Sequence, residues 1–490
     1  MLQNRDGEVK LFNLFGLFST FLFVLLGFSA LEAKDSFKEF KKSQTESFKT
    51  YKDENDNAFR SYLKQQWESY SASVSSPLYE KPKPIDIAPA PAHEAPSVGP
   101  KVNIIVDKQG NGAINELKDE SFVKTSKADD VVVEFYGSKF VYAISQNIKK
   151  ANFYPNNQAG VANFFDAIAS SEYEDMVLDI QEKAKDMRLN DWGVYMLVTK
   201  IANATFSDEN NAKLFSWFIF NKLGYAVKVG VAKNRVVLMH YATKSIYSTP
   251  TYTIANKKYY ALWESAKESP KGVVSYKQEY PNAIKELDLS LEILPKFQEK
   301  REKKELKFSN LGTTYAFSFS YNKNLIDFMA SYPQADYEVF FNAPMEDITY
   351  QELANSFKEY LNGKKSSEAI NFVLHFVQNS FDYQQDNEHF SREKVMFAEE
   401  TLFYERSDCE DRAVLFSYLV KRFFGISVVG VKYDDHMATA LYIPLDGDKV
   451  EIKSKEFIIA DPTYKNASVG MSMPKYKSIK PKSYIMVKNS

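Results

Sequence analysis

The stretch "SDCEDRAVLF" holds Cys409, the only cysteine among the 490 residues of the chain. The apolar residues that follow recur at helical spacing, which predicts a helix that begins near Ser407 or Asp408, either of which would cap it. Ser407 and Glu410 have the spacing of a capping box. The thiol would then lie in the first helical turn. Free N–H groups and the positive end of the helix dipole favour a thiolate there, whereas the neighbouring carboxylates oppose it.

The partners that thiol chemistry requires follow in the same part of the chain. The polar neighbours of Cys409 argue against burial, so we expect a reactive thiol rather than an inert one. His436 stands in "YDDHMATALYIP", just before an alternating stretch that predicts a strand. Asp461 ends the apolar strand "EFIIADPTY", and the proline after it stops the pairing. Nucleophile, base and orienting carboxylate therefore occur in the order that papain-like chemistry uses.

Each of these three residues also has a structural interpretation. Cys409 would be a non-catalytic, partly buried thiol. His436 would be a histidine at a strand edge in ordinary hydrogen bonds. Asp461 would end its strand in an Asx-type turn.

The motifs "DCED", "DHMATALYI" and "ADPTY" together resemble the transglutaminase-like superfamily of bacterial exported proteins. The resemblance covers residues 346–470 and includes the upstream stretch "FVQNSFDYQQDNEHFSREKVMFAEETL". It implies a papain-like fold with a catalytic triad of Cys409, His436 and Asp461. Asp435 departs from the pattern, because glycine is common before the histidine. We expect this carboxylate to crowd the imidazole or raise its pKa.

The resemblance also implies a mechanism. The Cys409 thiolate would attack an amide or peptide carbonyl to form a thioester, and His436 would protonate the leaving amine. Backbone N–H groups at the helix start would stabilise the oxyanion. Water would then give hydrolysis, and an amine would give cross-linking; both outcomes stay open.

A metal is a secondary possibility at the same place. Some transglutaminase-like proteases bind calcium through carboxylates beside the cysteine, which here are Asp408 and Glu410. Capping and solvation explain acidic residues at a helix start equally well. We therefore expect no cofactor.

The composition of the chain bounds its function and architecture. The 62 Lys and Arg residues against 64 Asp and Glu residues give a net charge of −2, which provides no electrostatic case for nucleic-acid binding. The length predicts two to four domains. Strand-like and helical patterns occur in separate groups, so the expected fold class is α+β.

The first 33 residues indicate export. Residues 11–31 are strongly apolar and carry no charge, and Ala33 is a plausible cleavage point, as in a signal peptide. The run is also long enough for an uncleaved membrane anchor. We expect the rest of the chain in the periplasm or cell envelope, with its mature start near Lys34 or a tether at residues 11–31.

Residues 34–76 predict one long amphipathic helix. Phe37, Phe48, Phe59 and Tyr70 recur with a period of eleven across residues 36–70, which gives a nearly straight aromatic stripe. This stripe would pack on the protein itself or bind a partner. The likeliest break is at "DENDN", because Asn and Asp are poor helix-interior residues. Residues 77–100 are proline-rich and predict an extended linker or strap.

The remaining chain has the pattern of two copies of one module, near 150–265 and near 346–470. The first copy follows β-strands in a segment at 101–265, the second belongs to a domain at 346–490, and a β-rich connecting domain at 266–345 joins them. The pattern "LFS" at 214–216 matches "LFS" at 415–417, and this register places Asp208 on Cys409. His240 in "HYAT" echoes His436 in "HMAT", and Leu262 falls roughly where the second copy has Asp461. We expect the first copy to be inactive and to recognise a ligand or buttress its twin.

Two hypotheses about function follow. The chain is an exported cysteine-dependent hydrolase or transamidase that acts on a peptide or protein substrate through a thioester. Alternatively, it is a non-catalytic envelope scaffold or binding protein whose aromatic helix and modules bind a partner and whose triad is vestigial.

Overall fold

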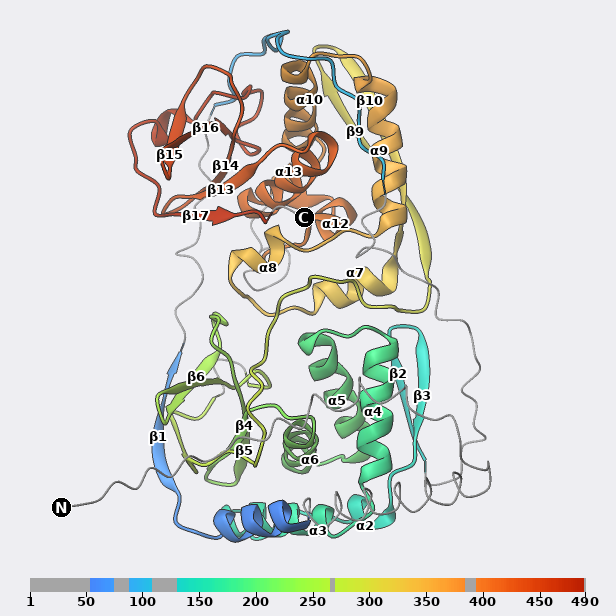
Figure 1. Cartoon of the computed structure of the whole chain (residues 1–490), viewed down its shortest axis with the longest axis vertical. Coiled ribbons are helices and arrows are strands. Elements are labelled where there is room, and N and C mark those ends of the chain that lie inside the picture. The colour runs from blue at the N-terminus through green and yellow to red at the C-terminus, as the bar shows by residue number, and fades with distance from the viewer. Residues whose placement is uncertain (1–52, 75–87, 108–129, 265–268, 384–393, 489–490) are drawn as a thin grey trace, which may run out of the picture. The chain divides into compact units, whose positions relative to one another are not determined.

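The computed structural model describes residues 53–74, 88–107, 130–264, 269–383 and 394–488 (Figure 1). The predicted signal peptide or anchor and residues 34–52 of the predicted aromatic helix lie outside these ranges. Among the helices that are described, none is long and apolar enough to cross a membrane. The described residues from Arg60 onward form one compact unit of mixed helices and strands.

The predicted continuous helix over residues 36–70 is wrong at its C-terminal end. Residues 53–63 are helical, including "DENDN", which the sequence identified as the weakest point of the helix. The chain then leaves the helix and forms strand β1 (Glu68–Val74), which contains Tyr70. Strand pairing with two other strands overrides the helical period here, and the Ser, Tyr and Val residues of "ESYSASV" tolerate that pairing well.

The first module is a helical layer against a closed barrel. Its strands are hydrogen-bonded in the order β1-β6-β7-β5-β4-β8, with all described pairs antiparallel. Helix α6 packs on β4 and β5, and α5 packs on α6. The elements after β1 are β2 (Val131–Phe135), β3 (Ser138–Tyr142), α2 (Gln146–Lys149), α3 (Gln158–Ala169), α4 (Glu174–Asp186), α5 (Asp191–Thr205), α6 (Glu209–Lys222), β4 (Val227–Ala232), β5 (Arg235–Tyr241), β6 (Pro250–Ile254), β7 (Lys257–Tyr260) and β8 (Gly272–Ser275).

The second module has helices packed against a five-stranded sheet of order β15-β16-β14-β13-β17. Helix α13 packs on β13 and β14, and α10 packs on α13. The elements are β9 (Arg301–Asn310), β10 (Thr313–Asn322), α7 (Lys323–Ala330), α8 (Tyr337–Phe341), α9 (Asp347–Leu361), α10 (Ser366–Asn379), β11 (Asp382–Tyr383), α12 (Ala398–Phe403), β12 (Arg406–Ser407), α13 (Cys409–Phe424), β13 (Val428–Lys432), β14 (Met437–Leu441), β15 (Lys449–Ile452), β16 (Lys455–Ala460), the 3-10 helix η2 (Pro474–Tyr476) and β17 (Ser483–Met486).

The two modules share their connectivity. In each module a helix leads into an antiparallel hairpin, which is β4–β5 in the first module and β13–β14 in the second. The next hairpin, β6–β7 or β15–β16, pairs through β7 or β16 with β5 or β14. The last strand, β8 or β17, pairs with β4 or β13. Thus β6-β7-β5-β4-β8 and β15-β16-β14-β13-β17 are the same arrangement. The first module adds β1, which pairs with both β6 and β8 and closes the barrel.

The connecting domain expected at residues 266–345 does not form a separate body. Strand β8 belongs to the barrel, and the β9–β10 hairpin packs on α9 of the second module (Figure 1). The ring of Phe317 in β10 lies 4.4 Å from that of Phe357 in α9. The apolar faces of these strands are therefore buried by the adjacent helices rather than by a core of their own.

The proline-rich segment is a strap where it is described. Residues 88–107 follow the second module in extended conformation, and their backbone N–H groups bond to it. Ala90 donates to the carbonyl of Lys465 over 3.0 Å, and Val102 donates to that of Lys364 over 2.9 Å. Ala90 is also part of a buried apolar cluster that includes Val429 and Ala440 of the sheet.

Candidate active site

Cys409 is the first residue of α13, so the thiol lies in the first turn as predicted. The N-cap is Asp408, and its backbone N–H donates to Asp411 Oδ2 over 3.2 Å in a reciprocal capping box. The expected box between Ser407 and Glu410 is therefore wrong, because the helix begins one residue later than that pair requires. Ser407 Oγ instead accepts a hydrogen bond from Arg412 over 3.0 Å.

His436 and Asp461 meet at the ends of their strands. A tight turn joins β13 to β14, and the backbone N–H of Tyr433 donates to the His436 carbonyl over 2.8 Å. His436 Nε2 lies 2.8 Å from Asp461 Oδ2, and both side chains are buried. Asp461 Oδ1 accepts from the backbone N–H groups of Thr463 and Tyr464. The orienting contact and the Asx-type turn therefore coexist, with one carboxylate oxygen used for each.

Tyr476 fixes the imidazole from one face. The two rings stack with centroids 4.9 Å apart and planes 21° apart. The Tyr476 hydroxyl donates to Asp435 Oδ1 over 2.9 Å, and Lys475 forms an ion pair with the same carboxylate. The expectation that Asp435 crowds the imidazole is wrong, since its bonds to Lys475 and Tyr476 hold the ring that supports His436.

Cys409 and His436 line one small cavity of about 10 Å³, which is room for about one water molecule. The other residues around it are Tyr337, Glu410, Lys432, Tyr433, Asp434 and Met437. No hydrogen bond joins the thiol to the imidazole within the described part of the chain. The thiol donates instead to Glu410 Oε2, 2.6 Å away. Because Nε2 faces Asp461, Nδ1 is the ring nitrogen left for the thiol.

The thiol is buried, which corrects the expectation that its polar neighbours would keep it exposed. Cys409 is 1% exposed, and Asp408, Glu410 and Asp411 are equally buried. The acidic stretch is accommodated because its carboxylates accept hydrogen bonds from the helix start and the thiol.

Burial also decides the protonation of the thiol. Burial raises the pKa of Cys409 well above its usual range, and the carboxylates of Glu410 and Asp408 raise it further. A hydrogen bond from the backbone N–H of Met437 acts in the opposite direction and is the smaller effect. The helix start therefore does not by itself produce a thiolate, and the resting thiol is protonated at neutral pH.

A buried ionic network beneath the site was not predicted from the sequence. Asp411 Oδ1 accepts from the backbone N–H of Met396 over 2.8 Å, which joins the start of α13 to the segment before α12. Glu400 of α12 forms a buried ion pair with Lys394. The acidic pair in the otherwise apolar "VMFAEETLF" is the feature of the sequence that indicates such a network.

The possible calcium site at Asp408 and Glu410 finds no support. Among the described residues, no group of three or more His, Cys, Asp or Glu side chains is arranged to hold a metal ion. Asp408 is engaged in the helix cap and Glu410 accepts from the thiol.

The strand registers identify the counterparts of the site in the first module. In the first hairpin of each module, Lys228 pairs with Met239 and Val429 pairs with Ala440, so these two pairs are equivalent. Met239 and Ala440 each belong to a buried apolar cluster on their sheet. The hairpin turn of the first module therefore ends at Arg235, which is the counterpart of His436. The resemblance of "HYAT" to "HMAT" was misleading.

The counterparts of the other two residues follow in the same way. His240 pairs with Tyr260, and its equivalent Leu441 pairs with Ile458, so Tyr260 is equivalent to Ile458. Asp461 lies three residues after Ile458 and therefore matches Trp263, one residue beyond the expected Leu262. Asp208 keeps its predicted place opposite Cys409, since both helices end in left-handed glycines, and it is the N-cap of α6. The thiol, imidazole and carboxylate of the second module are therefore replaced in the first by Asp208, Arg235 and Trp263.

A buried ion pair occupies this end of the first module. Glu264, beside Trp263, accepts from Arg235 over 2.7 Å and from Lys213 of α6. Lys213 is itself 2.6 Å from Glu209. These contacts provide no nucleophile, so the arrangement is structural.

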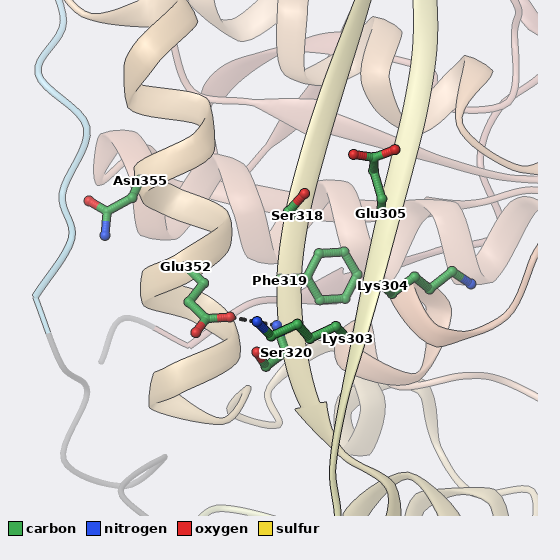
Figure 2. A pocket seen from close by; sticks show the side chains of 8 residues that line it. All are labelled: Lys303, Lys304, Glu305, Ser318, Phe319, Ser320, Glu352 and Asn355. Carbon is green, nitrogen blue, oxygen red and sulfur yellow. Dashed lines mark hydrogen bonds between the residues drawn. The ribbon is translucent and has the colours of Figure 1, made fainter.

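A separate groove of about 560 Å³ lies between the β9–β10 hairpin and α9. Figure 2 shows its eight lining side chains, among them Glu352 of α9, which accepts from the backbone N–H of Ser320 over 2.6 Å. Lys304 donates to the carbonyl of Phe403.

Comparison with known proteins gives no match: no protein-family model, no curated protein and no solved structure matches the chain. The resemblance to the transglutaminase-like superfamily therefore stays a prediction. The case for a function rests on the geometry around Cys409, His436 and Asp461.

Proposed function

We propose that the second module is a cysteine-dependent acyl-transfer site of papain-like, transglutaminase-like type that hydrolyses or transamidates peptide or amide bonds. The observation that carries this proposal is the convergence of three groups from three elements. Cys409 at the start of α13 and His436 before β14 line one cavity, and Asp461 after β16 holds the imidazole.

The chemistry proceeds through a thioester. His436 Nδ1 takes the thiol proton, and Asp461 stabilises the resulting imidazolium. Cys409 Sγ attacks the carbonyl carbon, and the imidazolium gives its proton to the leaving amine as the C–N bond breaks. Water or a second amine then attacks the thioester and releases the thiol. Backbone N–H groups at the start of α13 are suited to the oxyanion.

Substrate entry requires movement, because a cavity of about 10 Å³ admits no substrate side chain. The lining residues Tyr337, Tyr433 and Asp434 would have to move apart.

A non-catalytic scaffold is the second candidate function. The small size of the cavity and the bond from the thiol to Glu410 favour it, since both keep the thiol from a substrate. On this account the His436–Asp461 pair only ties two strand ends together.

Acylation by a small active ester separates the two candidates. We expect p-nitrophenyl acetate to give a burst of p-nitrophenol and an acetyl-enzyme visible by intact mass, with the acetyl group mapped to Cys409. The Cys409→Ala variant should give neither product. If folded wild-type protein releases p-nitrophenol no faster than this variant, the catalytic proposal is refuted and the scaffold is the function that remains.

We also propose that the chain is exported to the periplasm or cell envelope, on the strength of the apolar, uncharged residues 11–31. Cell fractionation with an antibody to the second module tests this. Export predicts protein that either starts near Lys34 or stays with the membrane through residues 11–31. Full-length protein found only in the cytosolic fraction would contradict export.

A further inference from the structure

Glu410 has no role in the reaction proposed above, yet it touches the nucleophile. Its Oε2 accepts the thiol hydrogen of Cys409 over 2.6 Å, and its side chain lines the same cavity as His436. Glu410 is 1% exposed, and Oε1 has no hydrogen-bond partner among the described residues. A buried carboxylate oxygen without a donor is costly, so this side chain is not placed there by stability alone.

Burial raises the pKa of Glu410 to about 7, so its carboxyl carries a full negative charge only above neutral pH. The helix cap takes Asp408 and Asp411, which leaves Glu410 outside the capping box. The charged and titratable groups that act on the pair are Asp408, Asp411 and Arg412 of α13, Tyr383 of β11, Lys432 of β13, and His436 and Asp434 in the cavity wall. Lys432 is the cation that shares the cavity with Glu410.

We propose that Glu410 is a positioning residue of this site, whose carboxylate holds the thiol hydrogen of Cys409 away from His436 and keeps the nucleophile in a resting, protonated state. The proposal deepens the function proposed above and depends on it only for the role of Cys409 as nucleophile. Activation then requires one proton to leave the Cys409–Glu410 hydrogen bond for His436 Nδ1. Movement of the Glu410 side chain, or neutralisation of its charge, makes that transfer easier.

Substitution of Glu410 by glutamine should therefore release the thiol. The amide removes the negative charge beside the sulfur. Its N–H can donate a hydrogen bond to a thiolate, whereas the carboxylate of Glu410 accepts one from the thiol. The measurement is the rate of Cys409 alkylation by iodoacetamide as a function of pH, followed by intact mass. For Glu410→Gln we expect the midpoint of the profile to fall by about one pH unit or more, and the rate at neutral pH to rise about tenfold.

The matched control is Glu209→Gln. Glu209 has the same place in α6, one residue after Asp208, but pairs with Lys213 and has no thiol beside it. Its substitution should leave the alkylation profile of Cys409 unchanged. If Glu410→Gln does not fold, Glu410→Ala removes the same carboxylate and should shift the profile in the same direction.

An alkylation profile of folded Glu410→Gln or Glu410→Ala that equals the wild-type profile, or a slower rate, would overturn the proposal. The outcome is separable from that of the active-ester experiment, because alkylation needs no acyl transfer. A shifted profile without an acetyl-enzyme would refute the proposed function and keep the role of Glu410. An acetyl-enzyme with an unshifted profile would refute only the role of Glu410.

Discussion

The two modules place different chemistry on one arrangement of strands. Where the second module has Cys409, His436 and Asp461, the first has Asp208, Arg235 and Trp263. In the second, a buried imidazole is held by a carboxylate beside a buried thiol. On the proposed function, the shared fold does not by itself provide activity, because only the second module has a thiol, an imidazole and a carboxylate at these strand and helix ends.

The difference extends to what stabilises each sheet. In the first module β1 closes the barrel, and Glu264 ties α6 to β5 through Lys213 and Arg235. In the second, the sheet stays a five-stranded sheet without a counterpart of β1. The closed barrel and the ion pairs of Glu264 suit the first module to a supporting role.

The largest expected effect is that of Asp461→Asn. The amide cannot stabilise the imidazolium, although it keeps the size of the side chain and the turn at Thr463. Acetyl-enzyme formation from p-nitrophenyl acetate should fall roughly a hundredfold or more. Stopped-flow release of p-nitrophenol measures it, and a loss below about threefold would mean that Asp461 only ends its strand.

The counterpart in the first module should lose stability instead of reactivity. Glu264→Gln removes the buried carboxylate that pairs with Lys213, which is 1% exposed, and leaves it only the exposed carboxylate of Glu209. The free energy of unfolding in urea should fall by about 3 kcal/mol, the scale of a broken buried ion pair. Acetylation of Cys409 should not change. A change in acetylation with no loss of stability would show that the first module takes part in the chemistry.

His240 offers a test in which one module is made to match the other. Its ring is fully buried, neither nitrogen has a hydrogen-bond partner among the described residues, and its counterpart is Leu441. His240→Leu should raise the free energy of unfolding at neutral pH by about 1 kcal/mol, because a buried polar group without partners is removed.

The same variant has a pH dependence of known sign. Burial lowers the pKa of His240 to about 3 in the folded state, whereas an unfolded histidine titrates near its ordinary value of 6.5. The wild type should therefore lose stability relative to His240→Leu as the pH falls below about 6.5, by up to about 1.4 kcal/mol per pH unit. Urea unfolding at several pH values measures this, and parallel curves would contradict the burial of a neutral ring.

The smallest effect compares the two helix ends. Gly224 follows α6 with φ of 84° and Gly425 caps α13 with φ of 66°, both in the left-handed region. Alanine at either position should cost about 1 kcal/mol of unfolding free energy. Similar losses at the two glycines would support the equivalence of the helices, and a loss at one alone would weaken it.

Local patterns in the sequence predicted the elements of the site but not their surroundings. The helix start at Cys409, the strand end at Asp461 and the register of Asp208 depend on short-range capping and periodicity, and they agree with the structure. Strand β1 was missed because its pairing with β6 and β8 is long-range and overrides a helical period.

The burial of Cys409 and the counterparts of His436 and Asp461 were missed for related reasons. Acidic neighbours indicate exposure unless the donors that satisfy them are known, and those donors come from the helix cap and from Met396. The resemblance of His240 to His436 was a coincidence of sequence, because His240 lies near the end of β5 whereas His436 lies just before the start of β14. Only the pairing of residues between strands, which requires the three-dimensional structure, identifies Arg235 as the counterpart of His436.

The most direct test of the account is a matched comparison of His436→Gln with Arg235→Gln. The two residues occupy equivalent hairpin positions, so each substitution removes a titratable or charged side chain from the same place in one module. The rate of Cys409 acetylation by p-nitrophenyl acetate should fall roughly a hundredfold or more in His436→Gln, the range of a lost general base, and should stay at the wild-type value in Arg235→Gln. Equal rates in wild type and folded His436→Gln would contradict the claim that the second module is a catalytic site.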